Sequence, residues 1–269
     1  MFMEESSHRK INFSTYLMDS KRVITNHFSK SIIERNYEVP IYRYLTFERL
    51  VEIITQKRIT IFNTSSWEDP YENFLYRTRI RGIGYYTSFE EFLDLTYGQC
   101  WTLRKETDAM WRIYSPNKQT MKIKTRISKL AAISRNEEDY QEYSTSYRFI
   151  APVEYYSKTR ILNLIKEHNL NALTVLKNPI ESLFIKREEF RHEQEVRLII
   201  QKNAQIEENI KKSIEPNFIS LIVEPNDFIE EIILDPRLNS NQAKLYSEIL
   251  KSLGFRNNIK KSKLYENFQ

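Results

Sequence analysis

The stretch that decides the fold is RHEQEVRLII, residues 191–200. Its second half is aliphatic and β-branched, which predicts a strand from Glu193 to Ile200. Alternate residues of a strand share a face, so Glu193, Glu195 and Arg197 would project from one side. The other side is apolar after its first member and would anchor the strand in a core. The segment therefore predicts a strand that presents two carboxylates and a guanidinium together.

The paired acids of this strand are the first candidate for chemistry. Two carboxylates this close raise the pKa of one of them, and the neighbouring Arg197 opposes that change. Such an environment suits acid–base or charge-stabilising work, so Glu193 and Glu195 are the candidate catalytic residues. The alternative is a solvated sheet face with cross-strand ion pairs, which contribute little to stability. Both interpretations remain open on this segment alone.

Short β-rich runs alternate with helical segments along the rest of the chain. Further strands are expected at residues 41–45, 58–62, 97–102, 120–127, 149–156, 219–223, 231–234 and 258–264. Helices are expected at residues 46–56, 108–114, 158–168, 171–177 and 241–253, where apolar side chains recur at helical spacing. The pattern predicts an α+β fold with a mixed, mainly antiparallel sheet and flanking helices.

The chain divides into a weakly patterned start and a periodic remainder. Residues 1–38 are polar, and the periodic region begins near Pro40. We expect an N-terminal arm or extension over residues 1–38, which either faces a protein partner or docks as a loose helix. No repeat and no Gly/Ser-rich linker follows, so residues 39–269 are expected to form a single α+β domain.

Composition narrows the class of protein. Of 269 residues, 41% are hydrophobic, which is enough for a packed interior, and only 4 are glycine, which argues against Gly-rich phosphate loops. The net charge of +5 is too small to predict nucleic-acid binding by itself. A single cysteine, Cys100, excludes an internal disulfide framework and fits a cytoplasmic protein. No apolar run approaches the ~20 residues that span a bilayer, so no membrane association is expected.

Two other segments offer partners for the acids. Arg43 lies on an otherwise apolar strand face, where a buried guanidinium must be paired because an unpaired buried charge is costly. Its expected partner is Glu193 or Glu195, unless it snorkels to water from an edge strand. The segment DPYE, residues 69–72, matches a helix start in which Asp69 is the N-cap and its second acid stands at N3. The free N–H groups of such a start can also bind an anion.

Aromatic side chains cluster in the segment MWRIY, residues 110–114. Trp111 and Tyr114 either pack in the core, as an aromatic stripe usually does, or stack on a planar ligand ring. The four histidines show no metal-ligand spacing, and neither a Walker loop, a dinucleotide fingerprint nor a nucleophile elbow occurs. No metal site is therefore predicted.

The order of these motifs resembles a known family. The succession is YRY at 42–44, DPYE at 69–72, Met110–Trp111 with Tyr114, and Lys186 followed by EQEVR at 193–197. Over roughly residues 40 to 235 it resembles the bacterial domain-of-unknown-function family numbered 2971. The chain has Glu68 where that family usually has Asn before Asp–Pro, and Asn117 opens a segment where it tends to have Gly. The family name implies no activity.

A second similarity is to ADP-ribosyltransferases. Those enzymes place an Arg or His on the first strand, a Ser or Thr on a middle strand, and a Glu within Glu-x-Glu or Gln-x-Glu on a late strand. Arg43, Thr102 and the pair Glu193 and Glu195 fall in that order here. The resemblance implies an ADP-ribosyltransferase-like fold and an enzyme that consumes NAD as its substrate.

The same resemblance implies roles for individual residues. Glu195 would stabilise an oxocarbenium-like transition state, Glu193 would activate the acceptor, and Arg43 would bind a phosphate or the nicotinamide side. The acceptor would be a protein or a nucleic acid, and the setting a bacterial toxin or phage-defence effector. Residues that would contact NAD are Tyr44, Thr102, Trp111, Tyr114, Arg197 and Asp69.

Two other functions fit the same residues. A nucleic-acid-binding module or Mg²⁺-dependent nuclease would use the net positive charge, the basic tail at 256–263 and the 17 tyrosines. Asp69, Glu193 and Glu195 could then hold Mg²⁺. A non-catalytic interaction protein would have acids lying flat on an open surface. An enzyme requires that Arg43 and the acid pair meet in one site.

Overall fold

The computed structural model describes residues 38–77, 80–81, 86–87, 93–134, 147–170, 179–202 and 217–266. The expected arm at residues 1–38 lies almost wholly outside the described residues, as does the helix expected at 171–177. No described helix has the length and apolar character needed to cross a membrane.

The described part of the chain builds one large sheet. Its strands are β1 (Pro40–Thr46), β2 (Arg58–Asn63), β5 (Thr96–Thr102), β6 (Thr120–Arg126), β7 (Tyr147–Pro152), β10 (Glu195–Gln201), β11 (Phe218–Ile222), β12 (Glu231–Leu234) and β13 (Asn258–Lys261). Their order is β11-β2-β5-β1-β6-β12-β13, and β10 pairs with both β5 and β7. Every pairing is antiparallel except that of β12 with β13. The predicted α+β class with a mixed, mainly antiparallel sheet is confirmed.

Two small sheets lie apart from the large one. They pair β3 (Ile80–Arg81) with β4 (Tyr86–Thr87), and β8 (Glu154–Tyr156) with β9 (Ile185–Arg187). The helices are α2 (Phe47–Gln56), α3 (Phe74–Arg77), α5 (Asp108–Tyr114), α6 (Ile127–Ile133), α8 (Lys158–Leu170), α11 (Pro225–Phe228) and α12 (Ser240–Ser252). Short 3-10 helices are η2 (Thr64–Ser66), η4 (Pro179–Phe184) and η5 (Glu188–Glu193).

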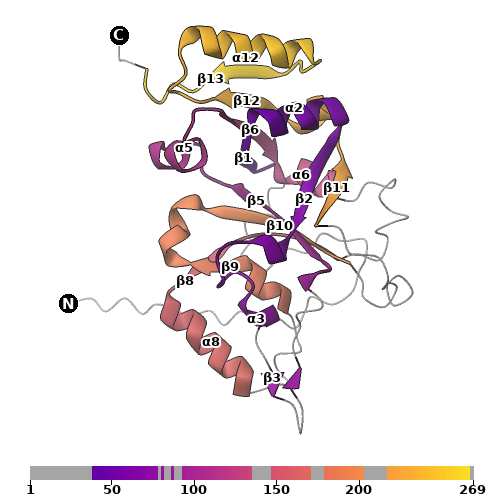
Figure 1. Ribbon diagram of the computed structural model, residues 1–269, viewed down its shortest axis with the longest axis vertical. Coiled ribbons are helices and arrows are strands. Elements are labelled where there is room, and N and C mark those ends of the chain that lie inside the picture. The colour runs from indigo at the N-terminus through magenta and orange to yellow at the C-terminus, as the bar shows by residue number, and fades with distance from the viewer. Residues whose placement is uncertain are drawn as a thin grey trace, which may run out of the picture.

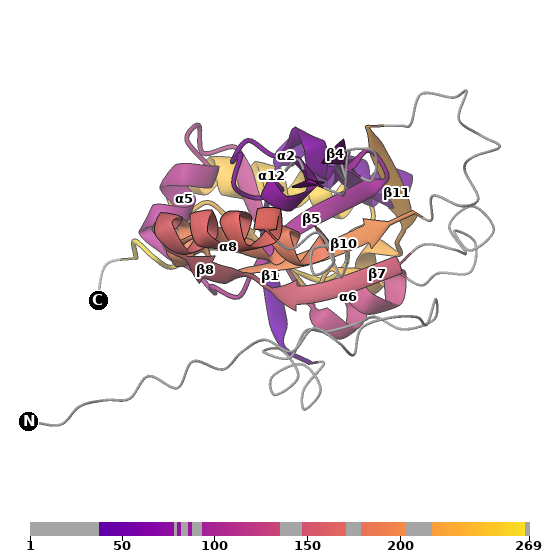
Figure 2. The same cartoon turned by 90° about the horizontal axis from the view of Figure 1, so that it is seen from below.

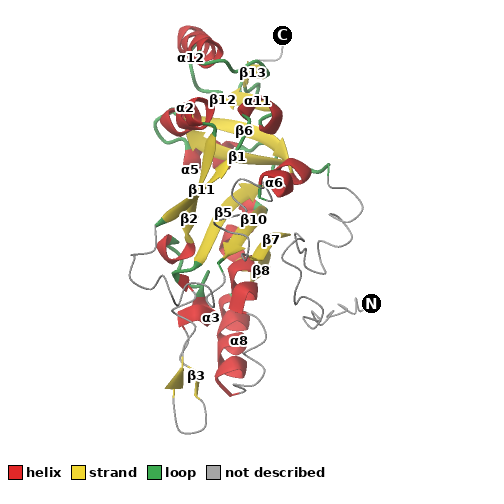
Figure 3. Cartoon of the chain, turned by 90° about the vertical axis from the view of Figure 1, so that its right-hand side faces the viewer, coloured by secondary structure: helices red, strands yellow, loops and turns green. Residues whose placement is uncertain are grey.

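The elements spread along one long axis. In Figure 1, α12 and β13 lie at the upper end, and α8 and β3 lie at the lower end. Figure 3 shows the same order after a quarter turn. Seen from below, α8 and β8 lie in front of β10, as Figure 2 shows. The small sheet of β8 and β9 therefore lies on the α8 side of the large sheet.

Local sequence accounts for several helix ends. Thr46 accepts a hydrogen bond from the Arg49 amide at the start of α2, as its position before the apolar stripe predicts. Asn239 and Gln242 form a full capping box at α12. Gly254 follows that helix with φ +93°, a conformation that an L side chain rarely adopts. The sheet draws strands from both ends of the described chain, and the single domain over residues 39–269 stays a prediction.

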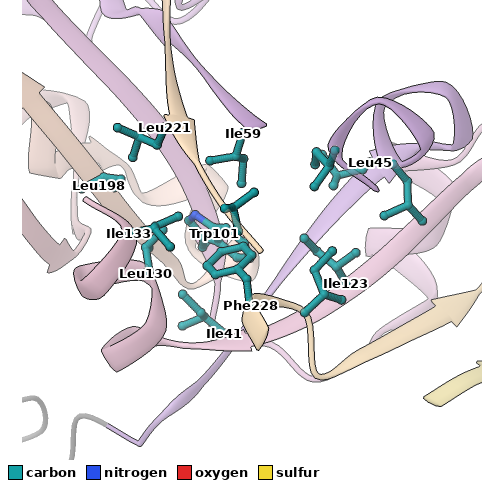
Figure 4. Close-up of a cluster of buried hydrophobic side chains, with 14 of the residues drawn as sticks. Ile41, Leu45, Ile59, Trp101, Ile123, Leu130, Ile133, Leu198, Leu221 and Phe228 are labelled. Atoms are coloured by element: carbon teal, nitrogen blue, oxygen red, sulfur yellow. The ribbon is translucent and has the colours of Figure 1, made fainter. Parts of the chain in front are cut away.

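The main core lies on one face of the large sheet, under α2 and α6. Trp101 of β5 occupies its centre, where its ring meets Phe228 at 5.9 Å between centroids (Figure 4). Ile41 of β1 and Ile123 of β6 are both fully buried in the same cluster. Most side chains on this face are apolar, and the charged side chains of β10 project from the opposite face.

At Gly98 of β5 the structure leaves no room for a side chain. An added Cβ would lie 2.4 Å from Cζ2 of Trp67 and 2.9 Å from Cγ2 of Thr64. We expect Gly98→Ala to lower the free energy of unfolding by about 1–3 kcal/mol, measured by urea denaturation, because the indole must shift. The double variant Gly98→Ala/Trp67→Phe should regain part of that loss. An unchanged unfolding midpoint in the single variant would contradict the predicted close contact.

Candidate functional site

Strand register determines which polar side chains share a face. Thr102 of β5 is paired with Tyr42 of β1 on one side and with Glu195 of β10 on the other. Directly paired residues of antiparallel strands project to the same side of a sheet. Arg197 is paired with Cys100, two positions along, and belongs to the same polar face. Glu195 and Arg197 therefore share a face, as the strand pattern predicts, and the register places Thr102 beside them.

Arg43 does not join them, and its expected pairing with the acids is wrong. It is one residue out of phase with Tyr42 and so lies on the core side of β1, with its guanidinium 6.0 Å from the centre of the Trp101 ring. Burial lowers the pKa of Arg43 to about 10. Among the described residues, no carboxylate forms an ion pair with it. A role for Arg43 in binding phosphate or nicotinamide beside Glu195 falls with that pairing.

Glu193 reaches the site by a different route from the one expected. It ends the 3-10 helix η5, and β10 begins only at Glu195. Between them Gln194 takes a left-handed conformation with φ 45°, which breaks the strand alternation. The hydroxyl of Thr102 donates to the carbonyl of Glu193, and the Leu103 amide donates to that of Gln194 at 2.9 Å. Thr102 therefore holds the turn that carries Glu193.

Lys186 of β9 joins the two acids. Its ammonium lies 2.6 Å from Oε2 of Glu193, 2.5 Å from Oε1 of Glu195 and 3.2 Å from Oε1 of Glu72. All four side chains are buried. Lys186 is absent from the sites predicted from the sequence, although it stands in the motif that resembles the family. The signal that could have found it is a lysine that directly follows Ile185 and opens the charged segment at residues 186–189.

Arg197 completes the arrangement from β10. Its Nε lies 2.7 Å from Oε2 of Glu195, and its Nη2 lies 2.7 Å from Oε1 of Glu72. Its Nη1 donates to the carbonyl of Leu183 at 2.6 Å, and the guanidinium lies 4.4 Å from the centre of the Trp67 ring. The side chain is fully enclosed, so it holds carboxylates and is not exposed to a ligand. We call Glu72, Lys186, Glu193, Glu195 and Arg197 the charged cluster.

The helix start expected at residues 69–72 is wrong. The helix α3 begins later, at Phe74, and residues 69–72 form a turn in which Oδ1 of Asp69 accepts from the Tyr71 amide at 3.0 Å. Oδ2 of Asp69 accepts from Arg187 at 3.0 Å. Glu72 points inward to the charged cluster. Buried cations need carboxylate partners, so Glu72 pairs with Lys186 and Arg197 and does not cap a helix.

Charge inside the cluster sets the two catalytic candidates apart. Burial alone would raise the pKa of Glu195, but Arg197 and Lys186 hold that pKa below its ordinary value. Burial and the adjacent Glu195 raise the pKa of Glu193. Burial would lower the pKa of Lys186, yet Glu195 and Glu72 raise it. Neighbouring acids whose pKa values move in opposite directions are typical of acid–base sites.

An aromatic group borders the cluster. The Tyr114 hydroxyl donates to Oε1 of Glu193 at 2.7 Å. Its ring stacks on Tyr44 at 5.5 Å between centroids, and Trp111 meets Tyr44 edge-on at 5.0 Å. Trp111 is fully buried and donates from its indole to Glu106, so stacking of Trp111 on a ligand is contradicted. Tyr114 is 40% exposed and offers the ring that a ligand can reach.

The polar face also holds one partly buried cysteine and one buried lysine. Burial raises the pKa of the Cys100 thiol to about 12, so this cysteine packs and does not react. Lys122 is fully buried against the rings of Tyr42, Tyr44 and Trp111, and burial lowers its pKa to about 8. Sequence reasoning missed Lys122, which lies among the β-rich residues of β6.

The carboxylates proposed as Mg²⁺ ligands are already bound to cations. Asp69 pairs with Arg187, and Glu193 and Glu195 share the ammonium of Lys186. In the part of the chain that the structure describes, no group of His, Cys, Asp and Glu has the geometry to hold a metal ion. These donors therefore do not fit a Mg²⁺ site as they stand. The acids are also buried, which contradicts a solvated sheet face.

Comparisons with known proteins give distant structural matches. Thermus sp. 2.9 DarT in complex with NAD⁺ has a TM-score of 0.36 and 11% identity, covering 84% of this chain and 96% of that chain. The same protein in complex with ADP-ribosylated ssDNA has a TM-score of 0.36 and 12% identity, covering 84% and 95%. Likenesses this distant determine no activity. No curated protein matches the chain.

A family model matches one continuous part of the chain. The match spans residues 110–198, from Met110–Trp111 through Lys186 to the acid pair and Arg197. It leaves out Arg43 and the segment at 69–72, so it is shorter than the resemblance expected over roughly residues 40 to 235. Over residues 110–198 the chain resembles the family described as a protein of unknown function (DUF2971), which is the family that its motifs predict.

Proposed function

We propose that the charged cluster and Tyr114 form the catalytic site of an NAD-consuming enzyme of the ADP-ribosyltransferase kind, acting as a transferase or as a glycohydrolase. The observation that carries the proposal is the pair Glu193 and Glu195, buried side by side with pKa values moved in opposite directions. The order of Thr102 and these two acids along the chain supports it through the resemblance to ADP-ribosyltransferases. Arg43 has no part in it.

Glu195 is the residue for charge stabilisation. Cleavage of the bond between nicotinamide and ribose develops positive charge on the sugar, which a nearby ionised carboxylate stabilises. A lowered pKa keeps Glu195 ionised at neutral pH. Lys186 and Arg197 fix its orientation through hydrogen bonds of 2.5 Å and 2.7 Å. The charged cluster has three acidic and two basic side chains, so its net charge is −1 when all are ionised. That negative charge favours the positive charge that develops on the sugar.

Glu193 is the residue for proton transfer. Its raised pKa brings it nearer to neutral pH than an ordinary glutamate, which favours action as a base on the acceptor hydroxyl or on water. The Tyr114 hydroxyl and the Lys186 ammonium hold one carboxylate oxygen each. The half-exposed ring of Tyr114, backed by Tyr44, provides a surface on which the nicotinamide ring can stack.

The remaining predicted contact residues take supporting positions in this proposal. Thr102 fixes the turn before Glu195, and Arg197 fixes Glu195 itself. Asp69 acts through Arg187, which lies over the ring of Phe190 beside Lys186. The setting we propose is a toxin or phage-defence effector of the bacterial cytoplasm, with a protein or nucleic acid as acceptor.

The proposal is tested by incubating the purified chain with NAD and following nicotinamide release, together with label transfer to protein and to nucleic acid. Wild type should release nicotinamide and Glu195→Gln should not. The matched control is Glu230→Gln, which makes the same change at an arginine-paired glutamate whose ion pairs, with Arg126, Lys124 and Lys129, include no residue of the charged cluster. Equal activity in wild type and Glu195→Gln, or equal loss in both variants, would remove the catalytic assignment.

A further inference from the structure

The helix that carries Tyr114 is too short to fix its own end. α5 has 7 residues and Tyr114 is the last of them, whereas isolated helices shorter than about 12 residues are marginal in water. The last carbonyls of any helix also lack partners within it. The Tyr114 hydroxyl lies 2.7 Å from Oε1 of Glu193, so contacts from outside α5 have to hold this end of the helix in place.

Arg237 binds that helix end from a segment that follows β12. Its Nη2 donates to the carbonyl of Trp111 at 3.2 Å and to the carbonyl of Ser115. A guanidinium at this position also faces the negative end of the helix dipole. The Thr120 hydroxyl, at the start of β6, donates to the carbonyl of Tyr114 at 2.8 Å. Two segments of the large sheet therefore hold the last turn of α5.

Asp235 orients Arg237 for this contact. Its Oδ1 accepts from Nε of Arg237 at 2.9 Å, and its Oδ2 accepts from Nη2 at 2.6 Å. Oδ2 also accepts from the Ser115 hydroxyl at 2.6 Å. Asp235 directly follows β12 and is fully buried, so parting it from its guanidinium would leave an uncompensated buried charge. The end of β12 is therefore a fixed anchor for α5.

We propose that Arg237 is a positioning residue of the catalytic site, because it fixes the helix end from which the Tyr114 hydroxyl donates to Glu193. The inference rests on the proposed function, in which Glu193 is the base. A hydroxyl that donates to a carboxylate favours the ionised form, which accepts the proton. Burial and Glu193 raise the pKa of Tyr114, so its hydroxyl keeps the proton and remains a donor. Arg237 lies beyond residues 110–198, which the family model matches.

The test measures the pKa of Glu193 by carboxyl ¹³C NMR, with the signal assigned through Glu193→Gln. Tyr114→Phe should raise this pKa by about 1 unit, since a hydrogen bond to a charged group contributes that much. Arg237→Gln should raise it as well. The double variant Arg237→Gln/Tyr114→Phe should exceed Tyr114→Phe by less than about 0.3 unit, because both changes remove the same contact. Arg237→Lys can still donate to a carbonyl and should restore part of the shift.

Two further variants separate positioning from a general loss of charge or fold. Arg112→Gln removes an exposed arginine of the same helix, paired with Asp108 at 2.9 Å, and should leave the pKa of Glu193 as in wild type. Asp235→Asn/Arg237→Gln removes both charges of the buried pair, so it leaves no unpaired acid inside the fold and no change in net charge. It should raise the pKa of Glu193 as Arg237→Gln does, and it provides the measurement where Arg237→Gln alone does not fold.

Kinetics keep this inference distinguishable from the proposed function. The acidic limb of transfer to the acceptor should move to higher pH in Arg237→Gln, by the amount that the pKa of Glu193 rises. If no form releases nicotinamide but that pKa responds as stated, the proposed function fails and the placement of Tyr114 by Arg237 stands. If the pKa stays at its wild-type value in the Arg237 variants, or if their effect adds in full to that of Tyr114→Phe, the inference is overturned.

Discussion

Replacing Lys186 with methionine is expected to lower the free energy of unfolding at pH 7 by about 3–5 kcal/mol, the usual cost of breaking a buried ion pair by removing one partner. Methionine nearly matches the lysine side chain in volume, so packing changes little. What is lost is the ammonium that lies between Glu72, Glu193 and Glu195 at 2.5–3.2 Å. Three buried carboxylates would then face a single cation, Arg197. Urea denaturation at pH 7 measures the change.

The pH dependence of that loss identifies its cause. In wild type the folded pKa of Lys186 is raised, so its stabilisation is fully present below the unfolded pKa, near about 10.4, and is lost only as the pH rises through the folded value. In Lys186→Met the carboxyl pKa values rise, and a raised acid pKa stabilises the folded state at low pH. The difference in free energy of unfolding between wild type and Lys186→Met should therefore become smaller as the pH is lowered from 7 to 5. A deficit that is the same at both values would contradict an electrostatic cause.

Lys122→Met is the matched control, because Lys122 is also a buried lysine on a strand, here β6 of the large sheet. Its ammonium donates to the carbonyl of Lys105, and its nearest carboxylate, Glu106, is 3.9 Å away. Burial lowers the pKa of Lys122 to about 8, so its charged form destabilises the fold near neutral pH and does not hold it together. We expect Lys122→Met to cost less than about 1.5 kcal/mol. A cost equal to that of Lys186→Met would mean that lysine burial, and not the acids, determines the loss.

Sequence periodicity correctly predicted the features that depend on alternation within a single strand. Glu195 and Arg197 are two apart on β10 and do share a face. The α+β class and most strand positions followed from the same local patterns. These features depend on alternation within a segment, which a single sequence contains.

The failures concern relations between segments. Whether Arg43 faces the acids depends on the register of β1 against β5, and a shift of one residue reverses the side on which it lies. The left-handed Gln194 separates Glu193 from the strand without a glycine to signal it. Lys186 enters through the parallel pairing of β8 with β9, which no local pattern specifies. Glu72 was assigned to a helix cap because capping is a local rule, while its actual partners lie more than a hundred residues away.

The pH profiles of Glu193→Gln and Glu195→Gln should separate the two acids. If Glu193 is the base, wild-type transfer to the acceptor falls as the pH is lowered through the raised pKa of Glu193, above the range of an ordinary glutamate. In Glu193→Gln that acidic limb should vanish and transfer should drop by about 10²–10⁴-fold, the usual contribution of general base catalysis. Nicotinamide release should fall less, because departure of the ring does not need this base.

Glu195→Gln should give the opposite pattern. Its lowered pKa keeps the wild-type carboxylate ionised throughout the working range, so loss of its charge should lower nicotinamide release by about 10²–10³-fold at every pH tested. The acidic limb that belongs to Glu193 should persist in the residual transfer rate but move to lower pH, because the charge of Glu195 no longer raises the pKa of Glu193. Both variants keep a side chain of the same shape that can still accept from Lys186, so a merely structural defect would reduce both reactions together. A common loss with an unchanged profile would show that the cluster holds the fold and performs no chemistry.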